Sequence, residues 1–253
     1  MSPNQWGVVI IGGVLVTIVF LLGLRTFVGK TTVEVDDVTN CPVDRSHQYS
    51  STVILIDRTD AITPSQRRYL ASIVNDLKSE FRLFEKVAIY PIDSSSAAAP
   101  MPLFSKCSPG DPNQANALFE NPELLREEFD REFAVPFERA FDGFQDHTST
   151  ESPIVETIQA VMNNHRLDAR INSQKLIVIS DLLQNTNECS HYRSDGDWGG
   201  CSTSVPELYN VSASLIYLWR DAPRRIPRGA HLRLWEQYFA ANGATVSTFD
   251  TVR

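Results

Sequence analysis

The segment Thr52-Val-Ile-Leu-Ile-Asp-Arg-Thr-Asp60 joins an apolar run of strand type to a polar turn. The apolar part is uninterrupted, which is typical of a strand that is covered on both faces. A helix start follows, with Thr63 as the N-cap, Pro64 at the first helical position and Gln66 closing a capping box. This order of strand, polar turn and helix predicts the beginning of an α/β domain.

Strand and helix patterns alternate along the rest of the chain. Further strands are expected at 86–92, 102–105, 175–180, 213–219 and 245–249. Helices are expected at 63–81, from 123 to about 145 with a break at Pro136, at 153–165 and at 231–241. The alternation predicts a doubly wound, mostly parallel sheet with helices on both faces. In such sheets ligands bind beyond the carboxyl ends of the strands.

An uncharged apolar run from Gly7 to Leu24 precedes this domain. Its length is near the lower limit for crossing a bilayer, and Trp6 and Arg25 flank it as an interfacial aromatic and a cation. A cleaved signal peptide is the alternative, but residues 1–6 carry no basic side chain and the cleavage site would be poor. We therefore expect a single-pass protein with an anchor at 1–30, a polar tether at 31–50 and a globular domain at 51–253.

The four cysteines form an even set whose contexts suit disulfides. Cys189 and Cys201 bracket a polar, glycine-rich segment, whereas Cys41 lies before the first expected strand and Cys107 after the second. The pairs 41–107 and 189–201 would each contribute about 2–4 kcal/mol, although three pairings are possible. Zinc is the rival interpretation, but neither a C-x-x-C motif nor histidine spacing supports it.

The cysteines and the flanking charges point to opposite sides of the membrane. Disulfides require an oxidising compartment, whereas Arg25 and Lys30 at the C-terminal end of the anchor favour a cytoplasmic domain. Two cations are a weak bias, and acidic residues follow them closely. We expect a bacterial inner-membrane protein with its domain in the periplasm, with a cytoplasmic domain as the alternative.

Charge argues against one class of partner. The net charge is −8 and the isoelectric point is about 5.1. Phosphate binding needs a basic face, so a nucleic acid is not expected as a partner. Arg220, Arg224, Arg225 and Arg228 do cluster after an expected strand; a charged loop is the simpler interpretation, and recognition of an acidic partner or a lipid headgroup is the alternative.

Three polar clusters fall at the expected carboxyl edge of the sheet. They are 57–60 after the first strand, 148–152 before a helix, and Ser180-Asp181 after the strand at 175–180. Hydroxyls and carboxylates gathered in this way suit a hard cation such as Mg²⁺, Mn²⁺ or Ca²⁺. Mg²⁺ keeps several waters and uses few protein oxygens, which fits so small a set.

These clusters, in this order, resemble the von Willebrand factor type A domain and its metal-ion-dependent adhesion site. The matching motifs are Asp-x-Thr after a buried strand, Ser152-Pro-Ile-x-Glu-Thr-Ile158, and Leu-Ile-Val-Ile-Ser-Asp181, and the resemblance spans about 51–250. It implies that Asp57 and Thr59 match the first loop of that site, that Ser152 stands where the family has Thr, and that Asp181 matches its last Asp. Thr59 and Ser152 would then touch the ion, the two carboxylates would act directly or through water, and a partner's carboxylate would fill the open position.

One position departs from the family pattern. Ala61 stands where the first loop has its second serine, so one direct hydroxyl ligand is missing. Asp60 could compensate, or the site could bind metal weakly or not at all. In that case Asp57 and Asp181 would only cap turns or helix N-termini.

The motifs favour a non-enzymatic binding module, with no catalytic or cofactor-binding residues, that recognises a protein partner at this edge. A metal-free scaffold subunit of a membrane complex is the alternative that Ala61 favours. A metal-dependent hydrolase of the haloacid dehalogenase type is a further alternative. Its chemistry needs Asp-x-Asp, but Thr59 occupies the second position and no downstream acidic pair appears.

Overall fold

The computed structural model describes residues 17–18, 33–95, 97–114, 121–142, 149–192, 208–220 and 227–252. The chain divides into two units, Met1–Glu34 and Val35–Arg253. Thr17 and Ile18 of the first unit are helical, and the rest of the expected anchor at 7–24 lies outside the described residues. Within the described ranges, no helix has both the length and the apolar character needed to cross a bilayer.

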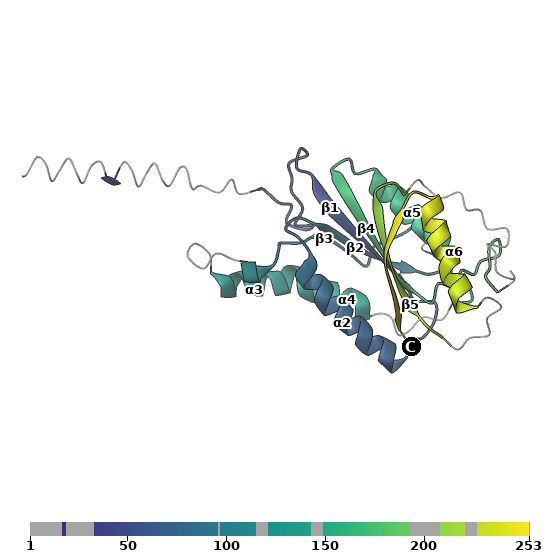
Figure 1. Cartoon of the computed structure of the whole chain (residues 1–253). Coiled ribbons are helices and arrows are strands. Elements are labelled where there is room, and N and C mark those ends of the chain that lie inside the picture. Colours follow the sequence, from purple (N-terminus) through teal and green to yellow (C-terminus); the bar gives the residue numbers. More distant parts are fainter. Residues whose placement is uncertain are drawn as a thin grey trace, which may run out of the picture. The chain divides into compact units, whose positions relative to one another are not determined.

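A single mixed sheet forms the centre of the second unit (Figure 1). Among the described residues its strands lie in the order β3 (Phe104–Cys107), β2 (Lys86–Ile92), β1 (Tyr49–Asp57), β4 (Ile171–Ser180), β5 (Val211–Leu218) and β6 (Thr245–Val252). All neighbours pair in parallel except β3, which is antiparallel to β2. The expected mostly parallel α/β sheet is therefore confirmed. The chain order reverses between β1 and β4, and their carboxyl ends form the switch point at which such sheets bind ligands.

Helices cover both faces of the sheet (Figure 1). The first face packs against α2 (Pro64–Glu80) and α4 (Val135–Asp142), and the second against α5 (Ile154–Arg166) and α6 (Arg228–Ala241). Successive strand residues point to opposite faces, so Ile54 belongs to the first core and Val53 to the second, and both are fully buried. Burial on both faces is the reason that the run at 52–56 shows no polar alternation.

The helix expected from 123 to about 145 consists of three pieces. α3 (Pro122–Phe129) passes into a π-helical turn, Asp130–Ala134, and then into α4. A proline inside an α-helix lacks the N–H for the ladder, and its ring clashes with the carbonyl four residues earlier. The wider π turn ends two residues before Pro136 and accommodates this conflict, so the expected break is a change of helix type.

Two boundaries at the edges of the sheet differ from those expected. The edge strand β3 lies two residues later than the expected 102–105, and its pairing places Cys107 opposite Lys86. β6 runs to Val252, three residues beyond the expected end.

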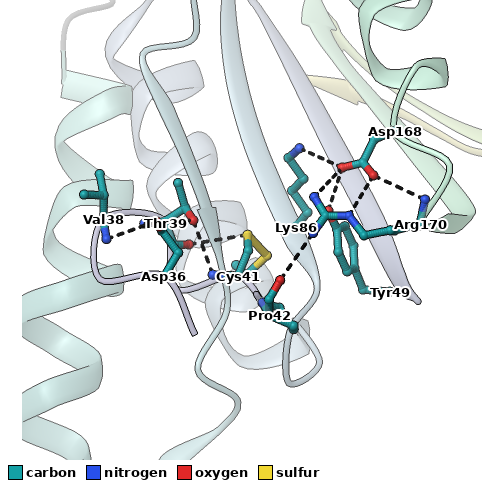
Figure 2. Close-up of a disulfide and its surroundings, with 10 residues drawn as sticks. Asp36, Val38, Thr39, Cys41, Pro42, Tyr49, Lys86, Asp168 and Arg170 are labelled. Carbon is teal, nitrogen blue, oxygen red and sulfur yellow. Dashed lines mark hydrogen bonds and ion pairs between the residues drawn. A yellow bond between two sulfur atoms is a disulfide. The ribbon is translucent and has the colours of Figure 1, made fainter. Parts of the chain in front are cut away.

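The segment before β1 is attached to the domain through a disulfide between Cys41 and Cys107 (Figure 2). The backbone N–H of Cys107 also donates to the carbonyl of Thr39 at 2.7 Å. From Val35 onward, the residues that the sequence suggested as a tether belong to the second unit. Cys189 is also disulfide-bonded, and Cys201, its expected partner, lies outside the described residues.

A second group of contacts fixes this segment at the amino-terminal end of the sheet (Figure 2). Asp168 accepts hydrogen bonds from the Tyr49 hydroxyl at 2.6 Å and from Nε of Arg170 at 2.9 Å. The Arg170 guanidinium also donates to the carbonyl of Pro42 at 3.2 Å. The Arg170 guanidinium, followed by the Tyr49 hydroxyl, holds the pKa of Asp168 far below its usual range.

Candidate functional site

The residues that the sequence assigned to a metal site lie at the carboxyl edge of the sheet. Asp57 ends β1, Asp181 directly follows β4, and Ser152 precedes α5. Together with Thr59 they form what we call the carboxyl-edge site, and all four are buried, with between 2% and 6% of their surface exposed. The structure thus brings together residues more than a hundred positions apart in the sequence.

The carboxylate of Asp57 accepts hydrogen bonds from several residues of the carboxyl-edge site. Its Oδ1 accepts the Thr59 backbone N–H at 2.9 Å and the Thr59 hydroxyl at 2.6 Å. Its Oδ2 accepts the hydroxyls of Ser152 at 3.2 Å and Ser180 at 2.6 Å. A carboxylate has about four acceptor positions, so this set satisfies Asp57 fully. Each hydroxyl donates a hydrogen bond to Asp57, and its oxygen keeps a lone pair that can face a cation.

Ser180 was noted at this strand end but was not assigned to the site. Its hydroxyl donates to Asp57 and also accepts the backbone N–H of Leu182 at 2.8 Å. Leu182 has a φ of 57°, an unfavourable left-handed conformation for a non-glycine residue. The indole N–H of Trp235 donates to the Leu182 carbonyl at 3.0 Å and holds the other side of this turn. The polar pair Ser180-Asp181 at a strand end was the only signal available in the sequence.

Asp181 lies in an environment that disfavours its charge. Burial, followed by repulsion from Asp57, raises the pKa of Asp181 to about 6. Its Oδ1 accepts the backbone N–H of Leu183 at 2.9 Å, and its Oδ2 lies 3.7 Å from Nε of Arg220. Two buried carboxylates that repel each other form a site whose energy a cation would lower.

Backbone hydrogen bonds connect the loops that carry these side chains. Ser149 donates to the carbonyl of Thr59 at 2.9 Å. Ser152 and Asn185 exchange two backbone hydrogen bonds, at 2.8 and 2.9 Å, and the Asn185 side chain donates to the carbonyl of Thr150 at 2.7 Å. The site therefore rests on three mutually bonded loops and is held in place before any ligand arrives.

Arg220 brings a positive charge to the carboxylates of this edge. Its guanidinium forms an ion pair with Asp60 and lies near Asp181, with 18% of its side chain exposed. The sequence suggested a loop charge at this position, whereas the structure places the guanidinium between two carboxylates. Ala61, which replaces the family's second serine, is exposed and offers no ligand atom.

The donor set fits a hard divalent cation. Thr59, Ser152 and Asp181 supply hydroxyl and carboxylate oxygens, which are the ligands that Mg²⁺ and Mn²⁺ prefer. In the described part of the chain, no three His, Cys, Asp or Glu side chains are arranged to hold a metal ion. A cation at this edge would therefore depend on the two hydroxyls, which suits an ion that keeps most of its water.

A cavity of about 810 Å³ lies at the opposite end of the sheet. Residues of the segment before β1 and of the turn between α5 and β4 line it, among them Pro42, Asn164 and Arg170. This cavity is open to solvent and its lining does not include Asp57, so the carboxyl-edge site and this cavity are separate features.

Comparisons with solved structures give distant likenesses, and two of them are described below. No protein-family model matches the sequence, and no curated protein matches it. The SpRpn10 VWA domain is 12% identical, with a TM-score of 0.41 and coverage of 80% of this chain and 88% of that one. An aerotolerance-related membrane protein from Bacteroides fragilis NCTC 9343, with multiple mutations to serines, is 8% identical, with a TM-score of 0.35 and coverage of 78% and 91%.

Proposed function

We propose that this chain is a membrane-anchored protein-interaction module, similar to a von Willebrand factor type A domain, that binds its partner at the carboxyl edge of the sheet. The observation that carries this proposal is the hydrogen-bonded set around Asp57. Hydroxyls from the loops after β1 and before α5 both donate to this one carboxylate, at 2.6 and 3.2 Å. The order of these motifs in the sequence is that of the family's adhesion site.

The proposed site holds a divalent cation such as Mg²⁺, Mn²⁺ or Ca²⁺. Thr59 and Ser152 would offer hydroxyl oxygens and Asp181 would act directly or through water, while Asp57 would orient the two hydroxyls and contribute its negative charge. The cation would supply positive charge to a surface at which two carboxylates now repel each other. An acidic residue of a protein partner could then complete the coordination.

The saturation of Asp57 supports binding rather than nucleophilic catalysis. All of its acceptor positions are occupied by donors from Thr59, Ser152 and Ser180. A carboxylate nucleophile needs a free lone pair directed at its substrate, and this arrangement offers none.

The proposed location is the bacterial inner membrane, with residues 7–24 as the anchor and the domain in the periplasm. The disulfide between Cys41 and Cys107 supports this orientation, because such bonds persist in oxidising compartments.

A metal-free scaffold subunit is the second candidate, and Arg220 is the observation that favours it. Its guanidinium already compensates Asp60 and lies beside Asp181. This candidate predicts that Asp57→Ala and Asp181→Ala leave partner binding unchanged as long as the domain remains folded.

Calorimetric titration of Mg²⁺ and Mn²⁺ into the full-length chain in detergent tests the proposal. A saturable heat in the wild type that Asp57→Ala abolishes would support the cation site. Asp44→Ala is the matched control, because Asp44 is an exposed carboxylate in the segment before β1. The absence of saturation at millimolar metal would favour the scaffold candidate.

A further inference from the structure

We infer that Arg220 is a built-in competitor for the cation: its guanidinium occupies the cationic position of the carboxyl-edge site and must leave Asp181 before a divalent ion binds there. The inference rests on the proposed function and adds a regulatory residue to it. It gives Arg220 a role that the sequence motifs do not contain.

The guanidinium of Arg220 lies between two loops of the carboxyl-edge site. It pairs with Asp60, on the loop after β1, and approaches Asp181, on the loop after β4, at 3.7 Å. These two loops carry three of the four candidate ligands. Arg220 therefore connects them from a third segment, two residues after the end of β5.

Hydrogen bonds hold the backbone next to Arg220 in a fixed position. The Trp219 N–H donates to the carbonyl of Val252 at 2.7 Å, and the Trp219 carbonyl accepts the side chain of Gln66 at 2.7 Å. Gln66 is fully buried and also closes the capping box of α2. A fixed origin reduces the entropy cost of holding the long arginine side chain in one place.

The Arg220 guanidinium and a divalent ion would compete for one oxygen atom of Asp181. Oδ1 of Asp181 is taken by the backbone N–H of Leu183, and both oxygens of Asp57 are saturated. Oδ2 of Asp181 accepts no hydrogen bond from the described residues, so it is the carboxylate oxygen most available to an ion, and it lies beside Nε of Arg220. Nε makes no hydrogen bond in the described part of the chain, so its contact with Asp181 is purely electrostatic.

The carboxyl-edge site contains more negative than positive side chains. Among the described residues, Asp57, Asp60 and Asp181 carry three negative charges, against the positive charges of Arg220 and of Arg58 on the loop after β1. The edge therefore keeps net negative charge and still attracts a cation, while the guanidinium repels an ion that approaches Oδ2. Charges a few ångströms apart near a protein surface interact strongly enough to shift metal affinity by an order of magnitude or more.

The test is calorimetric titration of Mn²⁺ into the full-length chain, comparing the wild type with Arg220→Gln. We expect Arg220→Gln to bind Mn²⁺ at least about tenfold more tightly. Arg68→Gln removes the same charge from an exposed position on α2 and should change affinity by less than about twofold. Adding Asp57→Ala to Arg220→Gln should abolish the gain, which assigns it to this site.

The outcomes separate this inference from the proposed function. Equal Mn²⁺ affinity in the wild type and in folded Arg220→Gln would overturn the inference and leave the cation site intact. Binding in Arg220→Gln but not in the wild type would support it and show that the guanidinium keeps the site closed. No binding in either protein would overturn both.

A second uncharged variant, Arg220→Met, guards against an effect peculiar to glutamine. It keeps an aliphatic stem and should show the same gain in affinity as Arg220→Gln. A competitor must be able to leave its carboxylates without unfolding the domain. If thermal melting shows that neither variant folds, Arg220 is a structural cation and the inference is overturned.

Discussion

Replacing Cys41 and Cys107 together with alanine should destabilise the domain by about 4 kcal/mol. The disulfide joins residues separated by 66 positions, and closing a loop of this length removes about 4 kcal/mol of conformational entropy from the unfolded chain. In a domain of this size, 1 kcal/mol changes the melting temperature by about 2–4 °C, so the variant should melt about 8–16 °C lower.

The assay is unfolding of the full-length chain in urea and by heating, followed by circular dichroism. The double variant is measured with and without a thiol reductant, because in the variant the reductant can act only on the disulfide of Cys189. Limited proteolysis provides a local measurement. Without the disulfide, the segment has no covalent link to β3 and is held by noncovalent contacts such as the hydrogen bond from Arg170 to the carbonyl of Pro42. New cleavage is therefore expected between Val35 and Tyr49.

A loss of less than about 1 kcal/mol in the oxidised double variant would refute this reasoning. It would show that the unfolded chain is already compact enough for the cross-link to remove little entropy. Unchanged proteolysis between Val35 and Tyr49 would show that the polar contacts alone hold the segment on the domain.

Three further changes test other parts of the structure. Burial lowers the pKa of His165 and of His191 to about 4, so the unfolded chain, with histidine pKa values near 6.5, takes up protons first on acidification. Stability should therefore be fully present above about pH 6.5 and decline towards pH 4 by up to about 3 kcal/mol per histidine, and a urea midpoint that is constant between pH 7 and 4.5 would contradict this. Ser180→Ala removes a donor to a buried carboxylate and should cost about 1.5–3 kcal/mol in urea unfolding, whereas Ser173→Ala, at an exposed position of the same strand, should be nearly neutral. Asp168→Asn should cost about 1–3 kcal/mol and abolish the part of the acid sensitivity below about pH 4, because the low pKa of this carboxyl stabilises the folded state only while it is ionised.

The sequence by itself determined the elements and the edge of the sheet at which to look for a site. The apolar runs at 52–56 and 175–180 lack polar alternation, because strands buried on both faces have no solvent side. The capping box at Thr63 and Gln66 depends on residues three positions apart, and both of its hydrogen bonds are present. Such signals are local, so they can be read without knowledge of distant contacts.

The sequence also indicated which polar clusters would meet. Parallel strands end at one edge, so Asp57 and Asp181 were expected near each other, and their charges do interact. The pairing of Cys41 with Cys107 was one of three possibilities, and the position of the segment before β1 beside β3 decided it.

Only the tertiary structure decided the electrostatics of the site. Arg220 is separated from Asp60 by the whole middle of the chain, and nothing local distinguishes it from a loop arginine. The role of Ser180 likewise depends on the strained turn at Leu182 and on the approach of Asp57 from another strand. Periodicity and capping record short-range preferences of the backbone, whereas the partners of a charge depend on which strand ends become neighbours. That second kind of information exists only once the sheet has formed.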